Sequence, residues 1–218
     1  MVKIVRRLQF KNIISGFLFI AISTSVFALN GEEKLDSSAQ ELKHLLSQLH
    51  TYSAHFEQKV MDANNELLQE AKGIINLQQP QKLYWEVLPP NEATLIADGK
   101  TLWHIDPFVE QVIALDQQHS VKDHPIMLLA QPNSDIWDGY QVAKVNEGEF
   151  MITPKSENQS IKQLVLFFDD GVLSQLIILD QQEQRNQLIF SDIKQNQEIS
   201  SQRFTFSMPS GFELDDQR

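Results

Sequence analysis

The stretch Thr94–Gln111, TLIADGKTLWHIDPFVEQ, constrains the fold more than any other part of this sequence. Residues on either side of Asp98-Gly99 alternate between two faces, as the side chains of a β-strand do. Asp-Gly supplies the positive φ angles of a type I′ turn. Asp106-Pro107 then ends the second strand, because proline cannot donate to a β-ladder. The stretch therefore predicts a β-hairpin with a type I′ turn, and with it an antiparallel sheet.

The same period of two recurs along most of the chain. Ala54, Phe56, Gln58 and Val60 fall on one face of a strand that ends at the turn-forming residues 62–65. Further strands are expected over residues 73–77, 83–87, 111–115, 140–145, 150–153, 161–168, 172–179, 186–193 and 203–206. Turn signals at this spacing indicate one large antiparallel sheet that is strongly curved or barrel-like.

Two segments break the strand pattern. Ser37–His50 has helical periodicity, and either Ser37 with Gln40 or Ser38 with Glu41 offers a capping box at its start. The apolar face of this predicted helix comprises Ala39, Leu42, Leu45, Leu46 and Leu49.

The second predicted helix is Asp123–Ala130. It is short and apolar, and Pro125 falls in its first turn, where proline is tolerated. An apolar helix inserted into a β-chain must rest on the sheet. The sequence therefore predicts an α+β fold, a half-barrel formed by a single curved antiparallel sheet under a cover of short helices.

Residues 1–28 have the pattern of a cleavable signal peptide. Four basic residues and no acidic one precede the apolar run Ile13–Phe27, and cleavage is expected after Ala28. The alternative, a membrane anchor, is disfavoured because the run has about 15 residues and a spanning helix needs about 20. We therefore expect one mature domain, residues 29–218, and in a bacterium a periplasmic location.

The expected mature chain is strongly acidic. Four of the 18 basic residues and none of the 29 acidic ones precede residue 29, which leaves a net charge of −15 for residues 29–218. Such a charge argues against binding to nucleic acid or to anionic membrane surfaces, because phosphate groups would be repelled. It favours basic patches on partner proteins, or it serves solubility alone.

No pattern of catalytic residues is visible. The chain has no cysteine, which excludes disulfides, thiolate metal sites and a lipid anchor attached through cysteine. No recognised zinc spacing or nucleophile motif is present, so we expect neither an enzyme nor a cofactor or metal. The six histidines are at positions 44, 50, 55, 104, 119 and 124.

The central hairpin sequence DGKTLWHIDPFVEQV (98–112) resembles the signature of the LolA-type outer-membrane lipoprotein carriers of Gram-negative bacteria. The resemblance covers most of the chain. It includes SAHFEQKV (53–60), PQKLYWEVLPPNE (80–92), HPIMLLA (124–130), ITPK (152–155) and FTFSMPSGFELDDQR (204–218).

This resemblance implies a function and partners. The protein would be a periplasmic chaperone, expected to be a monomer, that shields the acyl chains of lipoproteins in a hydrophobic cavity on the concave face of the sheet. It would accept this cargo from an inner-membrane ABC transporter and deliver it to an outer-membrane receptor.

The resemblance also implies the positions of the site. The acyl-chain cavity would include Phe56, Leu83, Trp85 and Val87, and the lid over it Leu42, Leu46, Ile126, Met127 and Leu129. Each of these residues fits an ordinary core position equally well. The arginine that ties the lid shut in the family is replaced here by Gln79, so we expect a weaker closure or one made by other contacts.

Three alternatives remain open. The receptor of this pathway shares the fold but is anchored through a cysteine, which this chain lacks. A lipid-binding periplasmic sensor would carry a second domain. A lipid-acting enzyme would show a buried cluster of histidine with a carboxylate or serine in the cavity.

Overall fold

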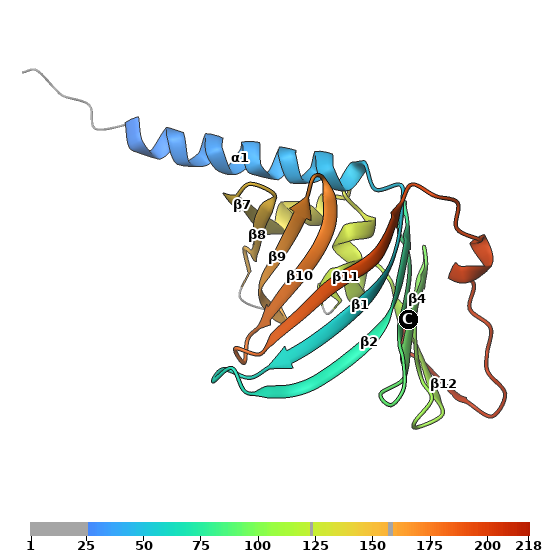
Figure 1. Ribbon diagram of the computed structural model, residues 1–218. Coiled ribbons are helices and arrows are strands. Elements are labelled where there is room, and N and C mark those ends of the chain that lie inside the picture. The colour runs from blue at the N-terminus through green and yellow to red at the C-terminus, as the bar shows by residue number, and fades with distance from the viewer. Residues whose placement is uncertain (1–25, 123, 157–158) are drawn as a thin grey trace, which may run out of the picture.

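The computed structural model describes residues 26–122, 124–156 and 159–218, with side chains from residue 37 onward apart from that of residue 122. It contains one open, strongly curved sheet of 12 strands in the order β12-β6-β5-β4-β3-β2-β1-β11-β10-β9-β8-β7 (Figure 1). All neighbouring strands are antiparallel except β12 and β6. The predicted fold class, a half-barrel of one antiparallel sheet with a helical cover, is confirmed.

The strands from the N-terminal half are β1 (Thr51–Met61), β2 (Leu67–Gln78), β3 (Lys82–Val87), β4 (Ala93–Asp98), β5 (Thr101–Asp106) and β6 (Gln111–Asp116). Those from the C-terminal half are β7 (Tyr140–Asn146), β8 (Glu149–Pro154), β9 (Ile161–Asp169), β10 (Val172–Asp180), β11 (Arg185–Gln195) and β12 (Glu213–Asp216). The helices are α1 (Val26–Ser47) and the 3₁₀ helices η1 (His119–Lys122), η2 (Pro125–Ala130), η3 (Asp135–Gly139) and η4 (Ser201–Phe204).

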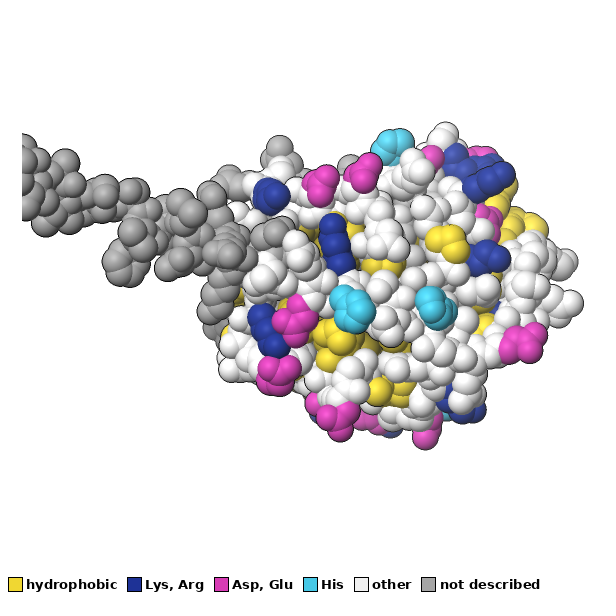
Figure 2. Space-filling model, turned by 90° about the horizontal axis from the view of Figure 1, so that it is seen from above, with side chains coloured by type: hydrophobic (Ala, Val, Ile, Leu, Met, Phe, Trp, Pro, Cys, Tyr) yellow, Lys and Arg dark blue, Asp and Glu magenta, His cyan; other side chains and the backbone are white. Residues whose placement is uncertain are grey.

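The alternation of side chains sets the two faces of the sheet. In β1, Tyr52, Ala54 and Phe56 are buried while His55 and Glu57 are exposed. The buried face is concave, and α1 and η2 pack against it to form the main hydrophobic core. The side of the molecule that carries α1 is mostly polar at its surface, with small hydrophobic areas between the polar side chains (Figure 2).

The central hairpin is present, but its predicted turn type is wrong. Of Asp98 and Gly99 only Gly99 has a positive φ, +104°, whereas a type I′ turn needs two such residues. Instead, the Asp98 carboxylate accepts hydrogen bonds from the backbone N–H groups of Lys100 and Thr101, at 2.8 and 2.9 Å. Asp98 therefore shapes the turn with its side chain rather than with its backbone angles.

The first helix is longer than predicted. It begins at Val26 and ends at Ser47, so Ser37 and Ser38 lie inside it and the predicted capping box is wrong. Good helix formers between residues 32 and 35 extend the helix upstream of the two serines. The expected leader lies outside the described residues up to residue 25, and its last three residues fall in the first turn of α1.

The second predicted helix forms as η2. It is a 3₁₀ helix with Pro125 at its start, and all six of its residues are buried. Its N-terminal position suits proline, which has no N–H to donate. The cover of the sheet therefore consists of one long α-helix and short 3₁₀ segments.

In the C-terminal strap, residues 197–218, the sequence predicted one element, a strand at 203–206. The predicted strand at 203–206 is wrong, because these residues belong to η4 and an extended segment on the convex face. There the Phe206 ring stacks on Trp103 at 4.0 Å between centroids, and the Arg203 guanidinium lies 4.8 Å from the centre of the Tyr84 ring. The strap ends in β12, which pairs parallel with β6 and forms one edge of the 12-stranded sheet.

Candidate functional site: the lid and the concave face

The floor of the concave face is aromatic. Phe56 of β1 stacks on Trp85 of β3, with ring centroids 4.0 Å apart and 23° between the planes. The two strands are separated by β2, and the residue of β2 paired with Phe56 is Gly73. Because Gly73 has no side chain, the Phe56 ring can cross β2 and reach Trp85. The alternation in β3 also places Leu83 in this buried cluster and Val87 partly buried at its edge.

All five residues predicted for the lid join the same cluster. Leu42 and Leu46 of α1 are fully buried. Ile126, Met127 and Leu129 of η2 are at most 7% exposed. The structure thus brings the predicted cavity residues and the predicted lid residues into one apolar core, in which α1 and η2 pack against the sheet.

Gln79 lies where α1 meets the sheet. Its side-chain Nε2 donates to the carbonyl oxygen of Leu46 at 2.8 Å, and its backbone N–H donates to the carbonyl oxygen of His50 at 2.9 Å. A glutamine amide therefore bonds the last turn of α1 to the β2–β3 turn. A bond of this neutral kind is worth about 1 kcal/mol, and one to a charged group about 1.5–3 kcal/mol.

Sequence analysis missed two further residues near the junction of the helical cover and the sheet. The backbone N–H of Gln81 donates to the carbonyl oxygen of Ala130, the last residue of η2, at 3.0 Å. The side chain of Gln117, 2% exposed, donates to the carbonyl oxygen of Gln81 at 2.7 Å. The only signal in the sequence is a polar residue between two apolar segments, which is too common to single out Gln117.

A buried phenol crosses the core. The Tyr52 hydroxyl donates to the carbonyl oxygen of Leu173 in β10 at 2.7 Å. Burial raises the pKa of Tyr52, so the phenol stays neutral and keeps its proton for this bond. The bond ties β1 to β10 across the concave face, and sequence analysis did not identify it.

The polar chemistry around the core is sparse. None of the six histidines is buried, and within the described ranges no Asp or Glu is buried either. No three His, Asp or Glu side chains of the described residues are placed to hold a metal ion. A surface cleft of about 350 Å³ beside Gln79 is lined by residues 79–81 and 130–135, which are largely polar.

In the part of the chain that the structure describes, no helix is both long and apolar enough to pass through a bilayer. The fold and the site define a class of protein, an open half-barrel whose apolar concave face is covered by helices.

Comparison with known proteins places the chain within this class. The family model described as "Outer membrane lipoprotein carrier protein LolA" matches residues 47–207. An outer-membrane lipoprotein carrier protein of Idiomarina loihiensis is 34% identical over 92% of this chain and 96% of its own length. One from Pectobacterium carotovorum is 32% identical over 92% of this chain and 98% of its own length. The chain belongs to the LolA family.

Among solved structures, a LolA superfamily protein of Nitrosomonas europaea is 11% identical, with a TM-score of 0.45, over 78% of this chain and 98% of that one.

Proposed function

We propose that this protein is a periplasmic carrier that shields the acyl chains of lipoproteins and moves them between membranes. Its cargo would come from an inner-membrane ABC transporter and go to an outer-membrane receptor, and the carrier would act as a monomer. The observation that carries the proposal is the single apolar core shared by the lid and the concave sheet. Opening the lid would expose this surface to acyl chains in place of the lid side chains.

The lid also accounts for reversible binding. Each buried methylene contributes about 0.8 kcal/mol, so several fully buried acyl chains would bind too tightly to be released. Cargo must first displace the lid, and the cost of exposing the apolar sides of α1 and η2 offsets part of the gain. The closed lid therefore lowers net affinity and permits transfer to a receptor that buries the chains better.

The absence of buried histidines and carboxylates from the described core favours a carrier over a lipid-acting enzyme. An enzyme would need a positioned acid, base or nucleophile near the acyl chains. The names of the two similar proteins, both outer-membrane lipoprotein carriers, support the same choice.

The proposal is tested with spheroplasts that express a tagged outer-membrane lipoprotein and the matching transporter. Purified protein (29–218) is added, and the supernatant is examined for the lipoprotein. We expect ATP-dependent release of the lipoprotein as a one-to-one complex with the carrier. A folded carrier that releases no lipoprotein would refute the proposal. A variant with an altered lid and equal stability controls for nonspecific extraction of the lipoprotein from the membrane.

Gln79 allows a prediction about the strength of the lid. In the Gln79→Arg variant, a cation replaces the neutral donor to the carbonyl oxygen of Leu46. We expect the equilibrium between the open and the closed lid to shift about fivefold toward the closed state, which corresponds to about 1 kcal/mol. Lid opening is measured by the binding rate of a fluorescent fatty acid, which should fall. The Gln79→Leu variant removes the donor, and the rate should rise. Equal rates and equal lipoprotein transfer in all three proteins would show that Gln79 does not hold the lid.

A further inference from the structure

Gln117 lies at the junction of three segments that are distant in sequence. It follows β6, and both polar atoms of its side-chain amide are hydrogen-bonded: Oε1 accepts from the backbone N–H of Gly99 at 2.9 Å, and Nε2 donates to the carbonyl oxygen of Gln81 at 2.7 Å. The first bond leads to the β4–β5 turn and the second to the β2–β3 turn. Because Gln117 is 2% exposed, water cannot readily replace either partner. Breaking one bond alone would leave a buried polar group unsatisfied.

On the side of the lid, the β2–β3 turn forms hydrogen bonds to α1 and to η2. Gln79 donates to the carbonyl oxygen of Leu46 in α1, and Gln81 donates to that of Ala130 in η2. The position of this short turn therefore determines whether both bonds to the lid can form. Gln117 holds the same turn from the other side.

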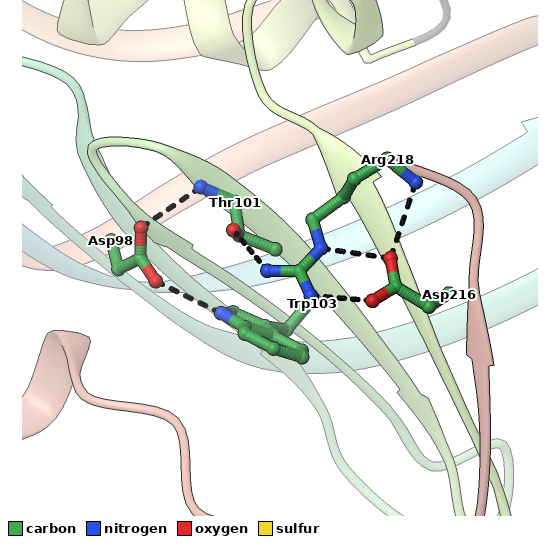
Figure 3. A network of polar contacts seen from close by, with 5 residues as sticks. All are labelled: Asp98, Thr101, Trp103, Asp216 and Arg218. Carbon is green, nitrogen blue, oxygen red and sulfur yellow. Dashed lines mark hydrogen bonds and ion pairs between the residues drawn. The ribbon is translucent and has the colours of Figure 1, made fainter.

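On the other side, the β4–β5 turn bonds to the C-terminal strap (Figure 3). The Asp98 carboxylate accepts from the backbone N–H of Thr101 at 2.9 Å and from the indole Nε1–H of Trp103 at 3.0 Å. The Arg218 guanidinium lies 5.3 Å from the centre of the Trp103 ring, donates to the Thr101 hydroxyl at 3.3 Å and pairs with Asp216. The strap thus contacts the turn through its last residue.

The charge of Asp98 supports this arrangement. Its partial burial would raise the pKa of the carboxyl, but the hydrogen bonds from Thr101, Trp103 and Lys100 outweigh burial and hold that pKa below its usual range. Asp98 is therefore ionised at neutral pH and is a strong acceptor for all three donors.

We propose that Gln117 is a positioning residue that couples the C-terminal strap on the convex face to the lid on the concave face. With the strap docked, the β4–β5 turn, Gln117 and the β2–β3 turn hold the positions in which the lid bonds form. When a partner lifts the strap, the same bonds loosen and the lid opens more often. The coupling deepens the proposed function. It rests on that function only in treating α1 and η2 as a lid over the cargo site.

The test measures amide hydrogen exchange by NMR in the mature protein without cargo, since exchange reports local opening. The probes are the Gln81 amide, which bonds to η2, and amides of β9 and β10 as distant references. We expect Arg218→Ala to increase exchange at Gln81 at least about fivefold, the lower limit for typical coupled sites. Exchange in β9 and β10 should not change.

Arg203→Ala is the matched control. It also removes a guanidinium from an aromatic ring under the strap, but that ring is Tyr84 of β3 rather than Trp103 beside the turn. We expect exchange at Gln81 to change less than twofold. Equal increases in the two variants would overturn the proposal, because they would show general loosening of the strap, and no increase in either would overturn it as well.

Variants of Gln117 separate positioning from general stability. Gln117→Leu should expose the Gln81 and Gly99 amides alike, and adding Arg218→Ala should then have no further effect at Gln81. Gln117→Glu keeps the acceptor for Gly99 but loses the donor to Gln81, so only the Gln81 amide should exchange faster. Full additivity of Gln117→Leu and Arg218→Ala would refute the coupling.

If Gln117→Leu does not fold, the comparison of Arg218→Ala with Arg203→Ala decides the question alone. No cargo or transporter is present in these measurements. A negative result here and a negative result in the spheroplast experiment are therefore independent of each other.

Discussion

Replacing Gly73 with alanine is expected to lower the free energy of unfolding by about 3 kcal/mol, the upper end of the cost of overpacking. A Cβ at this position would lie 2.1 Å from the carbonyl oxygen of Glu86 and 2.2 Å from Cζ of Phe56. The backbone of β3 cannot move away without breaking its ladder with β2. The Phe56 ring would also have to leave its stack on Trp85, which forms the floor of the proposed cavity.

Urea denaturation of the two proteins measures this difference. Gly139→Ala is the control, because a Cβ there would meet no heavy atom within 4 Å apart from those of its chain neighbours, and we expect a change within about 0.5 kcal/mol. Trp85 fluorescence, in a background with Trp103 and Trp137 replaced, should also report loss of the stack. An unchanged urea midpoint in Gly73→Ala would show that the sheet can open at this point without cost.

The second large effect is expected from a charge in the lid. Met127 of η2 is fully buried against the sheet, and Met127→Glu would place a carboxylate there without a partner. The penalty, more than about 3 kcal/mol, is larger than the contribution of any single hydrogen bond of the lid and opposes the burial that holds η2 on the sheet. We expect η2 to undock while the sheet remains folded, with faster exchange at Gln81 and loss of lipoprotein transfer.

The pH dependence of this variant follows from the same burial. A carboxyl in the closed lid has a raised pKa, so closure is penalised at neutral pH and the penalty is gone below about pH 4.3, the ordinary glutamate value. Lid protection should therefore return in acid. Met127→Leu conserves volume and should cost less than about 1.5 kcal/mol. A closed lid at neutral pH in Met127→Glu would contradict the prediction.

Local signals predicted most of the elements but not all of their details. The Asp-Gly pair marked the central hairpin correctly and its turn type wrongly, because the Asp98 side chain bonds to the backbone ahead of it and replaces the expected backbone geometry. The pair of positive φ angles that a type I′ turn needs occurs instead at Asp170-Gly171. The start of α1 was missed because two serines resembled a cap while helix-forming residues preceded them.

In the candidate site, too, the sequence predicted some features and missed others. The positions of Phe56, Leu83 and Trp85 on the buried face follow from the alternation of each strand. The sequence also predicted that η2 would rest on the sheet, and the family resemblance implied that these side chains and η2 share one site. Gln79 was identified through that resemblance, but its acceptor, the carbonyl oxygen of Leu46, is a backbone atom without any sequence signature.

By itself, the sequence determined which side of each strand is apolar and where the chain turns, because these properties depend on neighbours a few residues apart. It also determined that an apolar cover must exist. Only the tertiary structure decided that the strap lies on the convex face, and that Gln117 bonds to Gln81, 36 residues away, and Arg218 to Thr101, 117 residues away. Such contacts depend on the curvature and strand order of the whole sheet, which no local pattern encodes.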